Sequence, residues 1–332
     1  MQPVSEADTS IIREIESTGE RMGKVRAAIG NIIFGQNEVI DQTLITILAG
    51  GHALLVGVPG LAKTLLVHTT GTVMGLEDKR IQFTPDLMPG DILGSEVLEE
   101  SDTGHRSFRF IKGPVFCQLL MADEINRASP RTQSALLQAM QEKHVTVAGT
   151  RYELPQPFHV LATQNPLEQE GTYPLPEAQL DRFLLQIDVA YPALEAERRM
   201  LLATTGSTEL SVAAVLSAEE LRAAQRLVRR IPVGEQVVDA ILKLVRSARP
   251  EEDVSEEVVA HVAWGPGPRA SQALMLAVRA RALLDGRFAP SVDDVIALAA
   301  PVLRHRMALN FSARAESVTI GGVIERLCQE IA

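Results

Sequence analysis

Apolar residues in the first half of the chain recur at two different periods. Between Ile11 and Ile29, and again between Val39 and Leu48, they follow roughly helical spacing among charged positions, which is typical of amphipathic helices. Short apolar runs then alternate with helical segments, as in a parallel sheet that is buried on both faces. The predicted strands cover residues 53–56, 80–83, 115–124, 158–165 and 184–189. Segments 96–110 and 145–154 alternate between apolar and polar residues and predict two small hairpins.

The character of the sequence changes at Tyr191. Beyond this residue strand signals are nearly absent and helix starts are frequent, including the capping patterns at 217–220 and 291–294. Predicted helices lie near residues 218–230, 234–247, 255–263, 269–284 and 292–303. A chain of 332 residues favours two domains. We therefore expect an α/β domain over residues 1–190, which includes the N-terminal helix and both hairpins, and a compact helical domain over residues 191–332.

The turn between the first predicted strand and the next helix carries the clearest chemical signal. Its residues are Gly57, Val58, Pro59, Gly60, Leu61, Ala62, Lys63 and Thr64, and Leu65 continues into the helix. Glycines let backbone N–H groups curl around phosphate oxygens at the positive end of a helix. Lys63 is then expected to reach the β- and γ-phosphates of ATP, and the Thr64 hydroxyl to coordinate Mg²⁺. The general pattern has glycine in place of Ala62, and an ordinary strand-to-helix turn is the alternative interpretation.

Two carboxylates stand at the end of the predicted strand 115–124. Asp123 and Glu124 are costly there unless they are exposed in a site or paired with a cation. In a phosphate-loop protein, Asp123 would hold Mg²⁺ through its water shell, and Glu124 would polarise the attacking water. The next predicted strand ends at Asn165, whose amide would bond a γ-phosphate or that water. The dipeptide Asn165-Pro166 is also an ordinary turn signal.

Three further places offer weaker signals. The segment that ends in Gly35 and Gln36 lies between two predicted helices, and it either lines an adenine pocket or serves as a simple turn. Arg182 is carried by a short predicted helix, where an arginine is ordinarily just solvated. Arg269 stands in the first turn of a helix that follows a Gly-Pro segment.

Composition narrows the classes of protein to which the chain can belong. With 46% apolar and 22% charged residues it can bury a sizeable core. The net charge of −10 argues against a broad, nonspecific grip on nucleic acid. Cys117 and Cys328 are too far apart in sequence to suggest a disulfide framework or a metal site. Because no apolar stretch approaches a membrane span or a signal peptide, we expect a cytoplasmic protein.

Together these segments resemble the MoxR family of AAA+ ATPases, and the resemblance covers nearly the whole chain. It is carried by residues 57–64, 83–92, 113–116, 123–128, 162–166 and 180–183. Alanine at position 62 is normal in this family, and segment 265–269 departs slightly from the usual family sequence but keeps its arginine. The resemblance implies a P-loop αβα core with a five-stranded parallel sheet, followed by a small all-helical lid, with ATP and Mg²⁺ in the cleft between them.

The same resemblance implies roles for single residues. Asp123 and Glu124 match the Walker B pair, and Asn165 matches the sensor-1 position. Arg182 matches the arginine finger that is offered to a neighbouring subunit, and Arg269 matches the sensor-2 arginine of the lid. We accordingly expect Arg182 to act on a neighbour's nucleotide and Arg269 to fold over the nucleotide of its own chain.

Relatives of this kind form rings, commonly hexamers. They act as chaperone-like remodellers in the assembly, activation or metal-cofactor loading of a client protein complex, often with a partner that bears a von Willebrand factor A domain. The two predicted hairpins fall where this clade carries its inserts. A DNA-directed AAA+ motor, a chelatase-type motor subunit and a nucleotide-gated scaffold are the alternatives. The acidic balance disfavours the first, and the presence of Glu124 disfavours the last.

Overall fold

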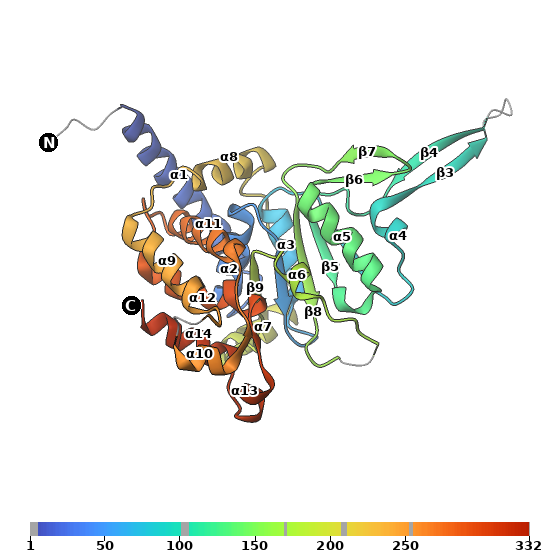
Figure 1. Ribbon diagram of the computed structural model, residues 1–332. Helices are drawn as coiled ribbons and strands as arrows, with labels where there is room; N and C mark the ends of the chain where they lie inside the picture. Colours follow the sequence, from blue (N-terminus) through green and yellow to red (C-terminus); the bar gives the residue numbers. More distant parts are fainter. Residues whose placement is uncertain (1–5, 101–105, 169–170, 207–210, 252–254, 332) are drawn as a thin grey trace.

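A five-stranded parallel sheet lies at the centre of the computed structural model, which describes residues 6–100, 106–168, 171–206, 211–251 and 255–331 (Figure 1). The strand order is β2-β5-β8-β1-β9. In this order the strands are Asp78–Gln82, Leu119–Asp123, His159–Gln164, Ala53–Val56 and Leu185–Asp188. All neighbouring pairs are parallel, so the predicted sheet is confirmed.

Alternate side chains of the central strands point to opposite faces of the sheet. On β5, Leu119 and Met121 belong to one apolar cluster, whereas Leu120 and Ala122 belong to the other. Helices α2 and α3 contribute to the first cluster and α5 to the second. Both faces are therefore covered, which explains the continuous apolar runs in the sequence. The helices of this part are α1 (Glu6–Gly30), α2 (Asn37–Leu48), α3 (Lys63–Val73), α4 (Pro89–Leu93), α5 (Pro130–Glu142) and α6 (Glu177–Leu180).

Strand β5 is shorter than the apolar run that predicted it. Val115, Phe116 and Cys117 are buried, but they lie in tight turns, since Phe116 N–H donates to Gly113 O and Cys117 N–H donates to Val115 O. Their side chains fill the second apolar cluster without joining the sheet. An apolar run thus reports burial more directly than it reports strand.

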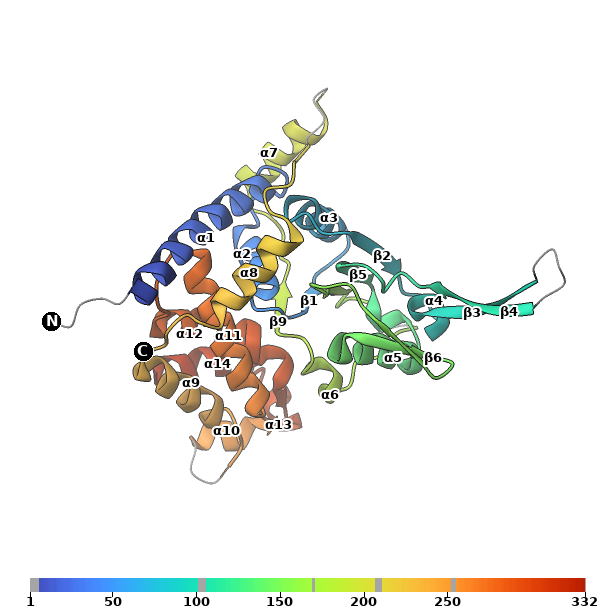
Figure 2. The same cartoon turned by 90° about the horizontal axis from the view of Figure 1, so that it is seen from above.

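Both predicted hairpins are present. The first pairs β3 (Gly94–Glu100) with β4 (Arg106–Lys112), and the second pairs β6 (His144–Val147) with β7 (Thr150–Glu153). The polar tip predicted for the first hairpin lies outside the described residues. The arms of this hairpin project far from the body of the molecule (Figures 1 and 2).

The C-terminal part is helical, as predicted, and its described residues contain three additional α-helices. Helices α7, α13 and α14 were not predicted, and neither was the small antiparallel pair of β10 and β11. These two strands are too short to show a period. Helix α7 lacks a core-facing stripe, because Ala196 is the one buried residue among its 11, all of which are described. The elements are α7 (Leu194–Thr204), α8 (Ala218–Val228), α9 (Glu235–Ser247), α10 (Glu256–His261), β10 (Val262–Trp264), α11 (Pro268–Leu284), α12 (Val292–Leu303), β11 (Ala308–Leu309), α13 (Phe311–Ala315) and α14 (Ile320–Gln329).

The C-terminal helical part, the lid, packs against the core through the two N-terminal helices. Helix α1 packs against α2, α3, α8 and α11, and α2 also packs against α11. Arg26 of α1 forms ion pairs with Asp41 of α2 (2.6 Å) and with Asp285 at the end of α11 (3.0 Å). One apolar cluster runs through all of these helices. Within the described ranges, no helix is both long and apolar enough to cross a membrane.

Two buried histidines lie where β1 and β8 begin. Val160 N–H donates to His52 Nδ1 (2.9 Å), His159 Nδ1 lies 2.8 Å from Gly51 O, and His159 Nε2 lies 3.0 Å from the Gln225 amide of α8. Burial lowers the pKa of His52 to about 3 and that of His159 to about 4, against 6.5 for a free histidine. Both rings are therefore neutral in the fold at neutral pH.

Stability should fall as the pH drops from 6.5 towards 4. The pKa of each histidine is depressed in the folded state, so in this window the unfolded chain binds protons that the folded chain does not. Each histidine then contributes a slope of up to about 1.4 kcal/mol per pH unit. Urea unfolding at several pH values should give a shallower profile for His159→Gln than for the wild type. Substitution of the exposed His68 by Gln is the control, and an unchanged slope in His159→Gln would contradict the prediction.

Candidate active site

The loop between β1 and α3 has the backbone geometry of a phosphate cradle. Gly57 packs so closely on β9 that a Cβ would lie 2.6 Å from Val189 O. Ala62 adopts the left-handed conformation with φ of 57°. This conformation costs an L-residue roughly 1–2 kcal/mol, which explains why the general pattern has glycine here. Helix α3 begins at the next residue, so its free N–H groups face the loop.

Lys63 is folded back into this loop. Its Nζ donates to Gly57 O (2.6 Å) and to Val58 O (2.8 Å). Burial lowers the pKa of Lys63, and the negative charges of Asp123 and Glu124 oppose that shift. The ammonium thus lies at a cavity of about 420 Å³. Its described lining residues are Pro59, Gly60, Leu61, Ala62, Lys63, Thr64, Leu65, Asp123, Glu124, Thr163 and Asn165.

The two carboxylates at the end of β5 are held in place by different partners. Asp123 accepts hydrogen bonds from Arg80 Nη2 (2.6 Å) and from Thr163 Oγ1 (2.5 Å). Glu124 has a φ of 55°, a strained backbone conformation of the kind that clusters at functional sites. Its Oε2 accepts from Gln82 Nε2 (2.8 Å) and from Arg127 Nη1 (2.9 Å).

Sequence reasoning missed all of these partners. Arg80 and Gln82 stand two residues apart on β2, which pairs with β5, so they share the face of the sheet edge where the carboxylates lie. That i, i+2 pattern was the available signal. Arg127 and Thr163 lie inside segments 123–128 and 162–166, which carry the family resemblance, but their spacing alone did not mark them as partners of the carboxylates.

The residues present fit Mg²⁺. Thr64 and Asp123 line the same cavity and offer a hydroxyl and a carboxylate, which are the oxygen ligands that this ion prefers. When bound, the ion would neutralise charge on the β- and γ-phosphates. Asn165 is buried at the same cavity, and its Oδ1 accepts the N–H of Leu167 (3.1 Å). The amide NH₂ is therefore the end that can donate to a phosphate or a water.

Gly35 and Gln36 lie beside this cavity rather than in it. They line a neighbouring cavity of about 380 Å³ next to the end of β9, where Gln36 Nε2 donates to Ala190 O (3.4 Å). Gly57 also contacts this end of β9, so both segments lie at the same edge of the sheet. At Gly35, whose φ is 71°, a Cβ would lie 2.2 Å from the Cβ of Ala196. This placement suits an adenine pocket closed by α7, and the role stays a prediction.

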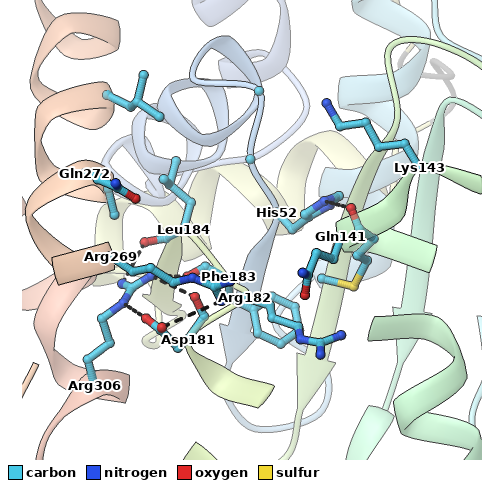
Figure 3. A pocket seen from close by; sticks show the side chains of 15 residues that line it. His52, Gln141, Lys143, Asp181, Arg182, Phe183, Leu184, Arg269, Gln272 and Arg306 are labelled. Atoms are coloured by element: carbon cyan, nitrogen blue, oxygen red, sulfur yellow. Dashed lines mark hydrogen bonds and ion pairs between the residues drawn. The ribbon is translucent and has the colours of Figure 1, made fainter. Parts of the chain in front are cut away.

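Arg182 and Arg269 lie together in a third cavity, of about 280 Å³ (Figure 3). Among the described residues it shares no lining residue with the phosphate-loop cavity. His52 lines it just before β1, and Leu184 lines it just before β9, whereas the phosphate loop follows β1. The two cavities therefore lie at opposite edges of a parallel sheet. Four residues of strand separate them by about 13 Å.

In this structure Arg269 does not line the phosphate-loop cavity of its own chain, where the expected role over its own nucleotide would place it, and that role stays a prediction. The lid docks through α1 and α2, which carries the first turn of α11 to the edge where β1 and β9 begin. There Arg269 Nη1 lies 3.8 Å from Asp181 Oδ2, next to Arg182 in the chain.

Comparison with known proteins identifies the family to which this fold belongs. Residues 52–185 match the family model described as ATPase family associated with various cellular activities (AAA), and residues 255–327 match an AAA lid domain. The chain is 43% identical over 305 residues to Chaperone MoxR1 of Mycobacterium tuberculosis, across 92% of this chain and 80% of that protein. It belongs to the MoxR family of AAA+ ATPases.

Two further comparisons agree with this placement. Protein MoxR of Paracoccus denitrificans is 30% identical over 308 residues, which are 87% of this chain and 89% of that one. A crystal structure of a Cytophaga hutchinsonii protein assigned as an ATPase matches with a TM-score of 0.90 and 37% identity, over 98% of both chains. The predicted P-loop core with a helical lid is therefore confirmed as the fold of a chaperone-like MoxR-family ATPase.

One further arginine of this MoxR-family site was not predicted. Arg306 is buried, and its Nε donates to Asp181 Oδ1 (2.7 Å) while its Nη2 donates to Phe183 O (2.6 Å). Arg306 thereby holds the residues directly before and directly after Arg182 in the chain. Figure 3 shows Arg269 and Arg306 gathered around Asp181. The run of basic residues 304–306 directly after the apolar helix α12 was the available signal.

Proposed function

We propose that this MoxR-family ATPase remodels a protein client in a closed ring, and that each Mg²⁺-dependent hydrolysis site is shared between two subunits. The placement of the two arginines supports the proposal. Arg182 and Arg269 line a cavity that is separate from the phosphate-loop cavity of their own chain, and this separation supports a role on a nucleotide bound by a neighbour.

In this proposal each chain contributes to two sites. It supplies the phosphate loop to the site shared with one neighbour and the two arginines to the site shared with the other. Lys63 and the N–H groups of the loop bind the phosphates of ATP, and Glu124 polarises the attacking water. The neighbour's Arg182 and Arg269 stabilise the negative charge that develops on the γ-phosphoryl group. Asn165 donates to the same region. Because the γ-phosphate contacts both chains, nucleotide binding and assembly strengthen each other.

Such a contact joins two different faces of the same chain. A head-to-tail interface of this kind closes into a ring when the rotation between subunits allows it, and otherwise continues as a filament. We propose the hexamer that is common among relatives.

The first hairpin supports a protein client over a DNA track. Val97, Leu98, Phe108 and Ile111 expose apolar side chains on it. Its arginines are neutralised within the hairpin, where Arg106 pairs with Glu100 (2.9 Å) and Arg109 with Glu99 (2.9 Å). A DNA-binding arm needs several free cations instead, and Lys112 is the one further cation on the described part of this hairpin. We propose that this hairpin contacts the client, and that a von Willebrand factor A domain protein assists, in assembly or metal-cofactor loading.

ATP with Mg²⁺ should convert Glu124→Gln from a small species into a ring, because this variant keeps the nucleotide that bridges the subunits. Lys63→Ala should stay small under the same conditions, since it lacks the cation that faces the β- and γ-phosphates. Sedimentation velocity with ATP, with and without Mg²⁺, measures both. A Glu124→Gln protein that remains monomeric at high concentration with saturating ATP and Mg²⁺ would refute the shared site.

A further inference from the structure

Helix α7 presents a row of leucines away from the body of the protein. Leu194, Leu201 and Leu202 are 78%, 58% and 69% exposed. At 100° per residue, Leu194 and Leu201 lie within about 20° of each other, and Ala196, the buried residue, lies about 160° from Leu194. The packed face of α7 is thus small and the outward face is apolar. Exposed apolar patches of this kind mark interaction sites.

Helix α7 stands on the nucleotide-binding face of the chain. Ala196 packs against Gly35, so close that a Cβ on the glycine would lie 2.2 Å from the alanine Cβ. Gly35 and Gln36 in turn lie against the end of β9, next to the phosphate loop. Helix α7 therefore lies at the same edge of the sheet as the phosphate loop, and its leucines face away from its packed side.

A groove of matching character lies on the arginine-bearing face. It is a cavity of about 460 Å³ between α9 and α11. Its apolar lining consists of Val238, Ile241, Leu242, Met275 and Leu276. The groove is continuous with the cavity that holds Arg182 and Arg269, because Gln272 and Leu276 line both.

We propose that the outward face of α7 docks into the α9–α11 groove of the next subunit. This inference rests on the head-to-tail ring proposed above, in which the nucleotide-binding face of one chain meets the arginine-bearing face of its neighbour. A chain cannot fill its own groove, because Figure 2 shows α7 and α9 at opposite ends of the molecule. A second copy is the favoured occupant, since the shared site already brings these two faces together.

Charges of both signs border the two apolar surfaces, and Arg229 lines the groove itself. One pair of them is complementary. Arg198 follows Leu194 by one turn and lies on the outward face of α7. On α9, Glu235 and Asp239 lie on the same stripe as Val238 and Leu242, and both acids are exposed. Leucines thus meet an apolar groove while the arginine meets a carboxylate at the rim.

Cysteine pairing tests the contact directly. Leu201→Cys and Leu242→Cys are introduced singly and together in Glu124→Gln, with ATP and Mg²⁺, and the native Cys117 and Cys328 are buried. Mild oxidation should give a ladder of covalent oligomers from the doubly substituted chain, dimers from a mixture of the two singly substituted chains, and neither product from either chain alone. Dimers of Leu201→Cys alone would overturn the head-to-tail contact. Rings that form by sedimentation without any cross-link would overturn the α7 contact but not the shared site, whereas absence of any ring would overturn both.

Substitution of the leucines supplies a functional readout. The double variant Leu194→Asp/Leu201→Asp should bind a fluorescent ATP analogue as the wild type does, yet fail to form the ATP-dependent ring. Its rate of ATP hydrolysis should fall at least roughly tenfold, because the neighbour's arginines no longer reach the nucleotide. Phe311→Asp is the matched control, since Phe311 is 86% exposed on α13, and it should assemble normally. Full assembly of the α7 variant, or an equal loss in the control, would overturn the proposal and leave α7 free for a client or partner protein.

Discussion

Glu124→Gln should hydrolyse ATP roughly 10²–10⁴-fold more slowly than the wild type, because an amide cannot polarise the attacking water. ATP binding should be unchanged. The amide keeps the shape of the carboxylate, and its oxygen still accepts from Gln82 and Arg127, which hold Glu124 in its strained backbone conformation. Phosphate release and equilibrium binding of a fluorescent ATP analogue, measured on the same preparation, separate the two effects.

The matched control is Glu325→Gln. Glu325 is exposed on α14 and lines neither the phosphate-loop cavity nor the arginine cavity as described, so its loss should leave hydrolysis unchanged. Hydrolysis at the wild-type rate in Glu124→Gln would remove the assignment of this residue. Equal loss of binding and of hydrolysis would instead indicate damage to the site as a whole.

Mixtures of inactive variants should regain activity in a pattern that identifies which residues act across the interface. Arg182→Ala and Arg269→Ala should each bind ATP but hydrolyse it slowly. For Arg182→Ala the rate should fall by roughly 10³–10⁵-fold, which is the contribution of an arginine finger. Either of them mixed with Lys63→Ala should recover activity. In a random equal mixture, about a quarter of head-to-tail interfaces pair an intact phosphate loop with an intact arginine face.

The mixture of Arg182→Ala with Arg269→Ala is the decisive control. Both arginines lie in one cavity of one chain, so every interface in this mixture lacks one of them and activity should stay low. Recovery in that mixture would show that the two arginines of one chain act on two different nucleotides. The mixture of Arg269→Ala with Lys63→Ala could also form rings without regaining ATP hydrolysis. That result would show that Arg269 acts on the nucleotide of its own chain.

The nucleotide-binding half of the site was predictable because its chemistry is local in sequence. The loop from Gly57 to Thr64 is one turn between a strand and a helix, and Asp123 with Glu124 ends a strand that is buried on both faces. Parallel strands bring such ends to one edge of the sheet. The strand period, the breaks at glycine and the position of the carboxylates therefore indicated the same site.

The position of Arg269 was not predictable in this way, because it depends on how two domains dock. That docking is held by contacts such as Arg26 with Asp285, which are 259 residues apart, and by apolar packing of α11 on α1 and α2. Helix α7 was not predicted for a different reason, which is local to its own sequence. Its apolar residues face outward, so no amphipathic stripe points to a core within the chain.

In the shared-site arrangement that we propose, the separation of the phosphate loop from the arginine cavity limits how many working sites an assembly can hold. Each chain completes the site of only one neighbour, so an open row of chains has one complete site fewer than it has chains. A pair of chains therefore works at half capacity, and a single chain has no complete site at all. Only closure of the row gives every chain a full site. Turnover per chain should accordingly rise with protein concentration and level off when the rings close.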